Sequence, residues 1–288
     1  MKEFKLVYDK MYDITIFKKY GLKPVSEDYY KIKDNCFCIA DGVTRDNING
    51  NPIKKPKNEK EAIEFIKEYP NPSGAYLAAK IIAESFVNNI SNIKENDISE
   101  EKIKQAIVKS NNELIDINKD RCIDYLKEDY YCCVSVGGYI TDNTLYAFSI
   151  GDCHISLFDE KYNLLFTTIN NHKWFEDYEK LHNFDWENPK DRKLIRSEYR
   201  NNPSKKENGK DITFGVLSGE KNAEYYIDVY KIDLKNVKYI CAYSDGCENL
   251  FSDTKKIETL LNNPEILENE EPERTLIKIG RASCRERV

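Results

Sequence analysis

Two Asp-Gly pairs, each placed after an apolar run, constrain this chain more than any other feature of its sequence. The first pair, Asp41 and Gly42, directly follows one run, and the second, Asp245 and Gly246, follows another run and a single serine. Apolar runs this rich in aromatic and branched residues predict buried strands. A carboxylate at the end of a buried strand is costly unless a positive charge lies beside it, so the pairs together predict a divalent-cation site. The alternative is that each Asp-Gly merely forms a turn.

Composition limits the class of protein. The 288 residues carry no internal repeat or linker-like tract, which favours one domain. Charged residues make up 33% of the chain and the net charge is -6, so we expect no basic face for nucleic acid. No apolar run is long enough to cross a bilayer, and the start of the chain lacks the apolar core of a signal peptide, which predicts a cytoplasmic protein. The nine cysteines show no zinc-type spacing and are expected to be reduced thiols.

The apolar patterns predict helices grouped apart from antiparallel strands, which favours an α+β layered fold over a doubly wound one. Short strand-like runs joined by tight turns indicate antiparallel pairing. Two amphipathic stretches, each preceded by a serine that can cap a helix, indicate an antiparallel helix pair that covers a sheet. The predicted elements are an N-terminal strand or hairpin over 5–16, helices after Ser73 and from near Ser99, strands over 131–139, 144–150, 154–158 and 164–169, a partly helical insertion over 174–210 and a helix over 253–262.

Short motifs in a fixed order resemble the metal-dependent protein phosphatase 2C family, in particular its microbial members, over most of the chain. No single motif is specific, but the ordered set is. The motifs are Ser26-Glu27-Asp28, residues 37–42, Ser73-Gly74-Ala75, Gly151-Asp152-Cys153-His154, residues 196–202, residues 215–220 and residues 243–250.

The resemblance implies a four-layer α/β/β/α sandwich, with two antiparallel sheets flanked by helices and the metals at one end. It implies that Asp41 bridges two Mn²⁺ or Mg²⁺ ions, with the Gly42 carbonyl and Glu27 on one side. Asp245 would ligate the other ion, and Asp28 would hold a metal-bound water. Hard divalent ions take carboxylate, carbonyl and water oxygens, which agrees with this set of residue types.

Several positions depart from the family pattern. Lys23 stands where many relatives carry a phosphate-binding arginine; it would bind phosphate as a point charge, or it is an ordinary exposed lysine. Val43 stands where some relatives carry a histidine thought to protonate the leaving group. If that role exists here, His154 and His172 are candidates only by their presence in the chain, since a lone histidine is more often structural.

Two further departures concern the metals. Asn249 replaces an aspartate that helps several relatives to hold a third ion, so Asp152 alone would form a weak third site, or would serve as a turn residue. The family's C-terminal strand pair carries an aspartate ligand of the ion shared with Asp245, and we find no equivalent here. Residues 279–288, in which arginine abruptly replaces lysine, resemble adapter-derived sequence. The predicted phosphatase 2C-like domain is therefore residues 1–278, incomplete at its C-terminus, and we expect the tail from Ile279 onward to pack against nothing.

The sequence therefore predicts a monomeric phosphomonoesterase that removes phosphate from phosphoserine or phosphothreonine of a partner protein by attack of a metal-bound water. Because of the departures above, we expect this chain to be catalytically weak or inactive as it stands. One alternative is a catalytically inactive phosphatase-like binding or regulatory module. Another is a domain with a structural Ca²⁺ and no catalysis. The retained acidic residues, Glu27, Asp28, Asp41 and Asp245, favour the enzyme.

Overall fold

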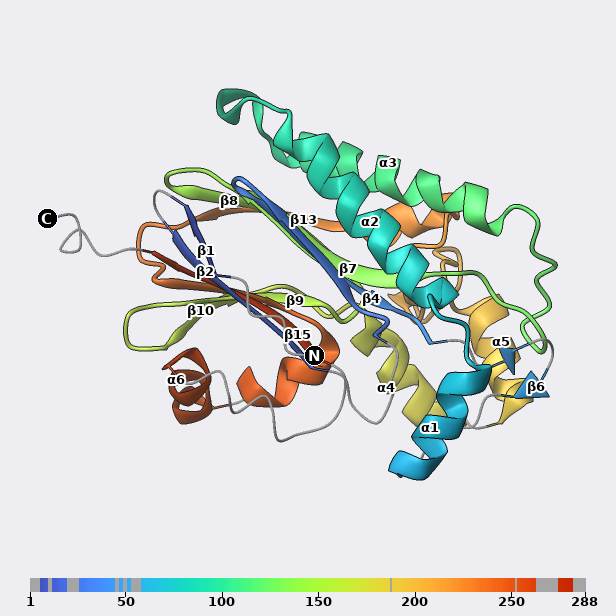
Figure 1. The fold of residues 1–288 in the computed structure, drawn as a ribbon. Helices are drawn as coiled ribbons and strands as arrows, with labels where there is room; N and C mark the ends of the chain where they lie inside the picture. Colours follow the sequence, from blue (N-terminus) through green and yellow to red (C-terminus); the bar gives the residue numbers. More distant parts are fainter. Residues whose placement is uncertain are drawn as a thin grey trace, which may run out of the picture.

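The structure is a computed structural model in which two antiparallel sheets pack face to face (Figure 1). It describes residues 6–9, 12–19, 26–44, 47–48, 51–52, 58–186, 188–251, 253–262 and 274–281. The five-stranded sheet has the order β13-β8-β7-β4-β3, and the six-stranded sheet has the order β1-β2-β15-β14-β9-β10. The predicted α+β sandwich of two antiparallel sheets is confirmed.

The strands of each sheet come from distant parts of the chain. In the five-stranded sheet they are β13 (Asp228–Asp233), β8 (Thr144–Ile150), β7 (Cys133–Ile140), β4 (Cys36–Gly42) and β3 (Tyr29–Lys33). In the six-stranded sheet they are β1 (Leu6–Asp9), β2 (Tyr12–Lys19), β15 (Arg274–Arg281), β14 (Tyr239–Tyr243), β9 (His154–Phe158) and β10 (Leu164–Thr167). Two small hairpins are formed by β5 (Asn47–Ile48) with β6 (Asn51–Pro52), and by β11 (Lys206–Glu207) with β12 (Lys210–Asp211).

Helices cover the outer faces of both sheets, which gives the four predicted layers (Figure 1). The pair α2 and α3 lies on the five-stranded sheet, whereas α6 and the 3₁₀ helix η3 pack on the six-stranded sheet. The helices are α1 (Glu59–Glu68), α2 (Gly74–Ser91), α3 (Glu100–Asn118), α4 (His172–His182), α5 (Pro189–Glu198) and α6 (Thr254–Asn262), with 3₁₀ helices η1 (Glu95–Asp97), η2 (Lys221–Tyr226) and η3 (Asp245–Phe251).

The continuous apolar run of β4 is explained by the burial of both faces of this strand. Successive side chains of a strand point to opposite faces. Phe37 and Ile39 enter the core between the two sheets, while Cys38 and Ala40 enter the core beneath α2 and α3. The helices themselves begin where the sequence predicts, because Ser73 and Ser99 accept hydrogen bonds from the backbone amides of Tyr76 and Lys102.

The C-terminal strand corrects one prediction. Ile279 is 1% exposed, and β15 lies between β14 and β2, paired with both. The expectation that the tail from Ile279 onward packs against nothing is therefore wrong for Ile279–Arg281, because these residues complete a central strand of the six-stranded sheet. The non-native origin of the tail stays a prediction.

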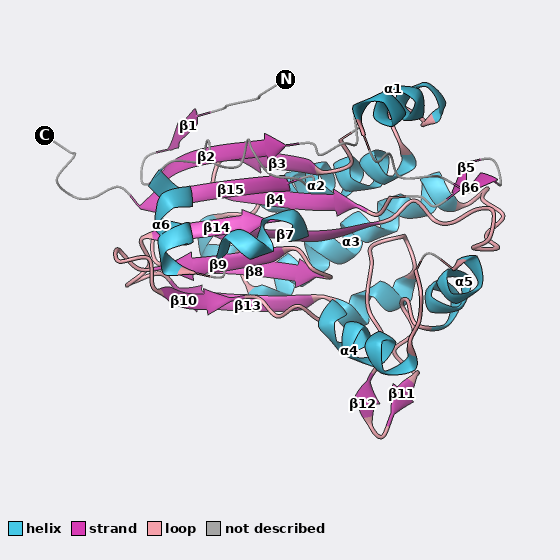
Figure 2. Cartoon of the chain, turned by 90° about the horizontal axis from the view of Figure 1, so that it is seen from below, coloured by secondary structure: helices cyan, strands magenta, loops and turns pink. Residues whose placement is uncertain are grey.

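The segment between β10 and η2, residues 168–220, is called the insertion below. It contains α4, α5 and the β11–β12 hairpin, and it projects from one end of the sandwich (Figure 2). The predicted partly helical insertion is confirmed. No helix in the described part of the chain is long and apolar enough to cross a membrane.

Candidate active site

Strand pairing brings the two Asp-Gly pairs to the same end of the sandwich. Asp41 at the end of β4 pairs with Val134 near the start of β7, and β7 continues the ladder to the end of β8. A tight turn at Gly151 and Asp152 then leads into β9, whose first residue pairs with the last residue of β14. Asp245 follows β14 after one residue. The register therefore places three acidic strand ends from both sheets at one edge.

Asp28, just before β3, connects this edge to the opposite sheet through two hydroxyl groups. Ser244 Oγ donates to Asp28 Oδ2 at 3.0 Å, and Thr275 Oγ1 donates to the same oxygen at 2.6 Å. The Thr275 amide in turn donates to Ser244 Oγ at 3.0 Å. Asp28 is 1% exposed, so these bonds hold a buried carboxylate in one position next to the residue that precedes Asp245.

Four of the predicted acidic residues raise the pKa of one buried thiol, that of Cys153. Burial raises the pKa of Cys153 well above its usual value, and the negative charges of Asp41, Asp152, Asp28 and Asp245 raise it further. An electrostatic effect of this kind requires that the carboxylates lie near the thiol. The four aspartates, which come from four separate segments of the chain, therefore lie within electrostatic range of Cys153.

The raised pKa of Asp245 shows that the neighbouring carboxylates repel one another. Burial and repulsion from Asp152 and Asp28 raise the pKa of Asp245 to about 6. Asp245 is exposed to solvent, which limits the effect of burial on its pKa. Of the two causes, we therefore give more weight to the repulsion between carboxylates. Like charges held close together disfavour the ionised form, and a bound cation relieves that repulsion.

This shift predicts that Asp245→Asn stabilises the metal-free protein at neutral pH. The native carboxyl has a raised pKa, so the folded state binds the proton more tightly and loses stability as the pH rises from about 4 to about 6. Thermal unfolding in EDTA should show a higher Tm for the variant at about pH 7.5 and nearly equal Tm values at about pH 3, below the unfolded-state pKa, where the carboxyl is protonated in both states. A Tm difference between the variant and the unchanged protein that stays constant across this pH range would contradict repulsion between Asp245 and its neighbouring carboxylates.

Glu27 occupies a different environment from the four aspartates. Tyr69 and Ser73 donate hydrogen bonds to Glu27 Oε1 at 2.5 Å and 2.7 Å, and Thr44 donates to Oε2 at 2.6 Å. Glu27 is 1% exposed, and the three hydroxyl groups give both of its buried carboxyl oxygens hydrogen-bond partners. These bonds fix the residue beside the start of α2, where Ser73 is the capping residue. Its role as a metal ligand stays a prediction.

Gly42 lies where the backbone leaves no room for a side chain. A Cβ atom at this position would lie 2.6 Å from the Ala75 carbonyl oxygen and 2.7 Å from the Glu27 carbonyl oxygen. The close approach holds the Asp41–Gly42 turn against both the start of α2 and the acidic segment before β3. Only glycine fits this junction without a shift of the backbone.

The donor set fits hard divalent ions. Among the described residues, no group of three or more His, Cys, Asp or Glu side chains is close enough to hold a metal by itself. Mg²⁺, however, is usually bound through one or two carboxylates and keeps several water ligands. The crowded aspartates around Cys153 supply carboxylate oxygens of this kind, and their mutual repulsion favours a cation among them.

The two candidate histidines lie in different settings. His154 Nε2 lies 2.8 Å from Glu248 Oε1, and its Nδ1 lies 3.3 Å from Thr168 Oγ1, so both ring nitrogens have partners. His172 begins α4, and its Nδ1 lies 3.8 Å from Asp152 Oδ2. His172 is therefore the histidine that the insertion brings to the acidic edge. Lys23 lies outside the described residues.

Sequence reasoning missed the hydroxyl groups that hold the acidic residues. Thr44, Tyr69, Ser244 and Thr275 all donate to Glu27 or Asp28. Thr275 is separated from Asp28 by 247 positions, and no local pattern marks either partner. Of the hydroxyl groups that hold Glu27 and Asp28, only those of Ser73 and Ser244 lay within recognised motifs.

Known structures share this fold. The serine/threonine phosphatase PstP/Ppp of Mycobacterium tuberculosis is similar over 95% of this chain and 100% of its own, with a TM-score of 0.60 and 12% identity. Stp1 of Staphylococcus aureus is similar over 98% and 100%, with a TM-score of 0.60 and 11% identity. The catalytic domain of PstP in complex with two manganese ions is similar over 95% and 99%, with a TM-score of 0.56 and 11% identity. No protein-family model and no curated protein sequence matches the chain.

The chain therefore has the fold of bacterial serine/threonine phosphatases of the phosphatase 2C type. The resemblance expected from the order of the motifs is confirmed at the level of the fold. At 11–12% identity, the similarity extends over nearly the whole chain but concerns its architecture alone.

Proposed function

We propose that this chain is a metal-dependent phosphomonoesterase that removes phosphate from phosphoserine or phosphothreonine of a partner protein. The observation that supports the proposal is that strand register and the Ser244–Asp28 hydrogen bond place Asp28, Asp41, Asp152 and Asp245 at one end of a phosphatase 2C fold. A phosphate ester is itself anionic, so an edge with this many carboxylates is suited to phosphate only when cations lie between them.

The acidic residues divide into holding and orienting roles in this proposal. Asp41, Asp245 and the Gly42 carbonyl would hold two Mn²⁺ or Mg²⁺ ions, with Glu27 on one side and Asp152 at a weaker third site. Such ions, when bound, lower the pKa of a coordinated water and offset the charge of phosphoryl oxygens.

Asp28 would orient the attacking water. Its carboxylate is suited to this task because Ser244 and Thr275 fix one of its oxygens. An oriented acceptor of this kind can take a proton from water as the new phosphorus–oxygen bond forms and the bond to the serine or threonine oxygen breaks. The leaving oxygen takes a proton and departs as the hydroxyl group, so no phosphorylated side chain is required.

A second candidate function is a phosphatase-like module that binds phosphorylated partners without turnover. Two observations favour it. Three hydroxyl groups already occupy the Glu27 carboxylate, and the described residues contain no three-ligand metal cluster. Both features would weaken the affinity for the ions on which hydrolysis depends.

A titration with Mn²⁺ separates the two functions. The protein is incubated with a small aryl phosphate and with a phosphoserine peptide, in EDTA and at rising Mn²⁺ concentrations. Hydrolysis that requires Mn²⁺ supports the enzyme. Saturable binding of the phosphopeptide, with no release of phosphate at any Mn²⁺ concentration, supports the binding module and contradicts the enzyme.

The proposed phosphate contact at Lys23 gives a kinetic prediction. Lys23→Ala should raise KM for a phosphopeptide more than it lowers kcat, because loss of a contact that is equally strong in the ground state and the transition state raises KM and leaves kcat unchanged. Steady-state kinetics at saturating Mn²⁺ provide the measurement. Kinetics equal to those of the unchanged protein would assign Lys23 to the ordinary surface.

A further inference from the structure

The connection between α3 and β7, residues 119–132 and here called the strap, touches the candidate site directly. The Val43 amide, which follows the Asp41–Gly42 turn, donates to the Cys132 carbonyl at 3.0 Å. The Tyr131 ring fills the space beside Gly74, where an added Cβ would lie 1.9 Å from the ring. The strap therefore supports both the turn that carries Asp41 and the start of α2.

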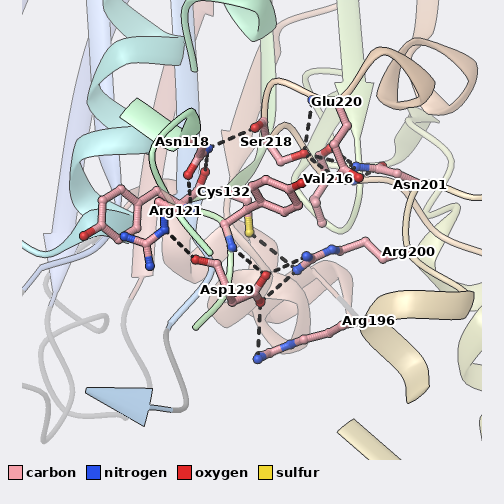
Figure 3. A network of polar contacts seen from close by, with 12 residues as sticks. Asn118, Arg121, Asp129, Cys132, Arg196, Arg200, Asn201, Val216, Ser218 and Glu220 are labelled. Carbon is pink, nitrogen blue, oxygen red and sulfur yellow. Dashed lines mark hydrogen bonds and ion pairs between the residues drawn. The ribbon is translucent and has the colours of Figure 1, made fainter. Parts of the chain in front are cut away.

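The other side of the strap is fastened to the insertion by a buried ion cluster (Figure 3). Arg200 donates to both carboxylate oxygens of Asp129, with Nη2 2.7 Å from Oδ1 and Nη1 3.0 Å from Oδ2. Arg196 adds a third contact, with Nη1 3.3 Å from Oδ2. Both arginine side chains and the Asp129 side chain are less than 10% exposed.

Asp129 is ionised in this cluster. Burial opposes the charge, but the charge and hydrogen bonds of Arg200, with the further charge of Arg196, hold the pKa of Asp129 below its usual value. Two cations thus face one anion in a buried region, where an ion pair with this bidentate geometry fixes its partners firmly.

A short chain of contacts joins the cluster to the metal-binding turn. Arg200 Nη1 lies 3.9 Å from Cys132 Sγ, and the carbonyl of the same Cys132 accepts the Val43 amide. Only one residue, Gly42, separates Val43 from Asp41. The insertion is therefore linked to the Asp41–Gly42 turn through one side-chain contact and one backbone hydrogen bond.

We propose that Asp129 is a positioning residue, which couples the place of the insertion to the geometry of the Asp41–Gly42 turn. The inference rests on the proposed function, because it assigns a role in the same reaction. The inference adds that the ion cluster of Asp129, Arg196 and Arg200 affects the turnover rate. Through this cluster, the position of the insertion would influence the candidate site.

The strap keeps a second attachment when Asp129 is changed. Asn118 accepts a hydrogen bond from the Tyr131 amide, and its side-chain nitrogen donates to the Tyr131 and Ser218 carbonyls (Figure 3). These bonds do not involve the ion cluster. Asp129→Asn is therefore expected to fold, with the insertion less firmly held.

The test compares Asp129→Asn with a matched control, Glu198→Gln. Glu198 lies on the same helix α5 as Arg196, and its ion pair with Lys205 is exposed to solvent. We expect Asp129→Asn to lower kcat for a small aryl phosphate by roughly 10- to 100-fold with a smaller change in KM, since a shift of about 1 Å at a reacting group has effects of this size. The control should retain the kcat of the unchanged protein.

Amide exchange of Val43, followed by NMR, provides a readout that does not depend on activity. Asp129→Asn should exchange this amide roughly tenfold faster or more, because the Cys132 carbonyl is less firmly placed. Arg196→Gln, which leaves the bidentate Arg200 pair in place, should change both readouts in the same direction and by less. It serves as the test variant if Asp129→Asn does not fold.

Two results would overturn the inference. One is Val43 exchange equal to that of the unchanged protein, which would remove the mechanical link. The other is faster exchange with an unchanged kcat, which would leave Asp129 a purely structural role. If the unchanged protein hydrolyses no phosphate ester, the proposed function fails, and the exchange measurement alone decides whether the insertion is coupled to the turn.

Discussion

Asp41→Asn is expected to reduce Mn²⁺-dependent phosphate hydrolysis by at least about 100-fold. Loss of a residue that merely orients a metal ligand costs about 10- to 100-fold in metal affinity or activity, and the proposed role of Asp41 as a direct bridge between two ions implies a larger loss. The amide keeps the size of the side chain but removes its charge. Steady-state kinetics at saturating Mn²⁺ give the comparison.

The same substitution should leave the fold intact and raise the Tm of the metal-free protein slightly. Asp41 lies among other carboxylates around Cys153, so removal of its charge relieves repulsion. Asp142→Asn is the matched control, since Asp142 is exposed in the turn between β7 and β8. Full turnover by Asp41→Asn would exclude Asp41 from the mechanism.

The fold was predictable where local chemistry and tertiary packing agree. The alternation in β4 satisfies two cores at once, and the serine caps at Ser73 and Ser99 mark helix starts through bonds made within three residues. The tight turn between β7 and β8 likewise fixes antiparallel neighbours from a short stretch of sequence. Such features need no knowledge of distant segments. The same expectation of antiparallel pairing is wrong for β8 and β9, because the turn at Gly151 and Asp152 carries the chain into the other sheet, where β9 pairs with β14 and β10.

The site was predictable only in part, because its environment is assembled over long distances. The acidic residues stood out as charges beside apolar runs. The partners that hold them did not, since a threonine or tyrosine hydroxyl carries no signal of what it will bind. Asp129 and Arg200 show the same difficulty, because 71 positions separate two residues whose pairing depends on where the insertion folds back.

The C-terminal strand shows how composition can mislead. The change from lysine to arginine after Lys278 marks a break in residue usage, but strand formation depends on apolar alternation and on available partners. Leu276 and Ile277 begin an apolar pattern that Ile279 continues, and β14 and β2 offer edges on both sides. Residues 279–281 continue this strand and pair with both neighbouring strands, whatever their origin.

Ile279→Asp should therefore destabilise the protein severely. Ile279 pairs with Ile240 of β14 and Ile14 of β2, and it belongs to the core between the two sheets. Truncation of a buried isoleucine to alanine costs about 2–5 kcal/mol, and aspartate adds the cost of burying a polar group. At about 2–4 °C per kcal/mol for a large domain, the Tm should fall by roughly 10 °C or more, or the protein should fail to fold.

Ile279→Val is the matched control, because it keeps the apolar surface and the preference for a strand. Its cost should be about 0.5–1.5 kcal/mol, which corresponds to a few degrees. Thermal unfolding of both variants beside the unchanged protein decides the point. If Ile279→Asp melts like Ile279→Val, the residues after Lys278 contribute nothing to the sheet, and the sheet closes without them. A large difference between the two variants would instead place these residues within the folding unit, because only a buried position distinguishes a carboxylate from a methyl group so strongly.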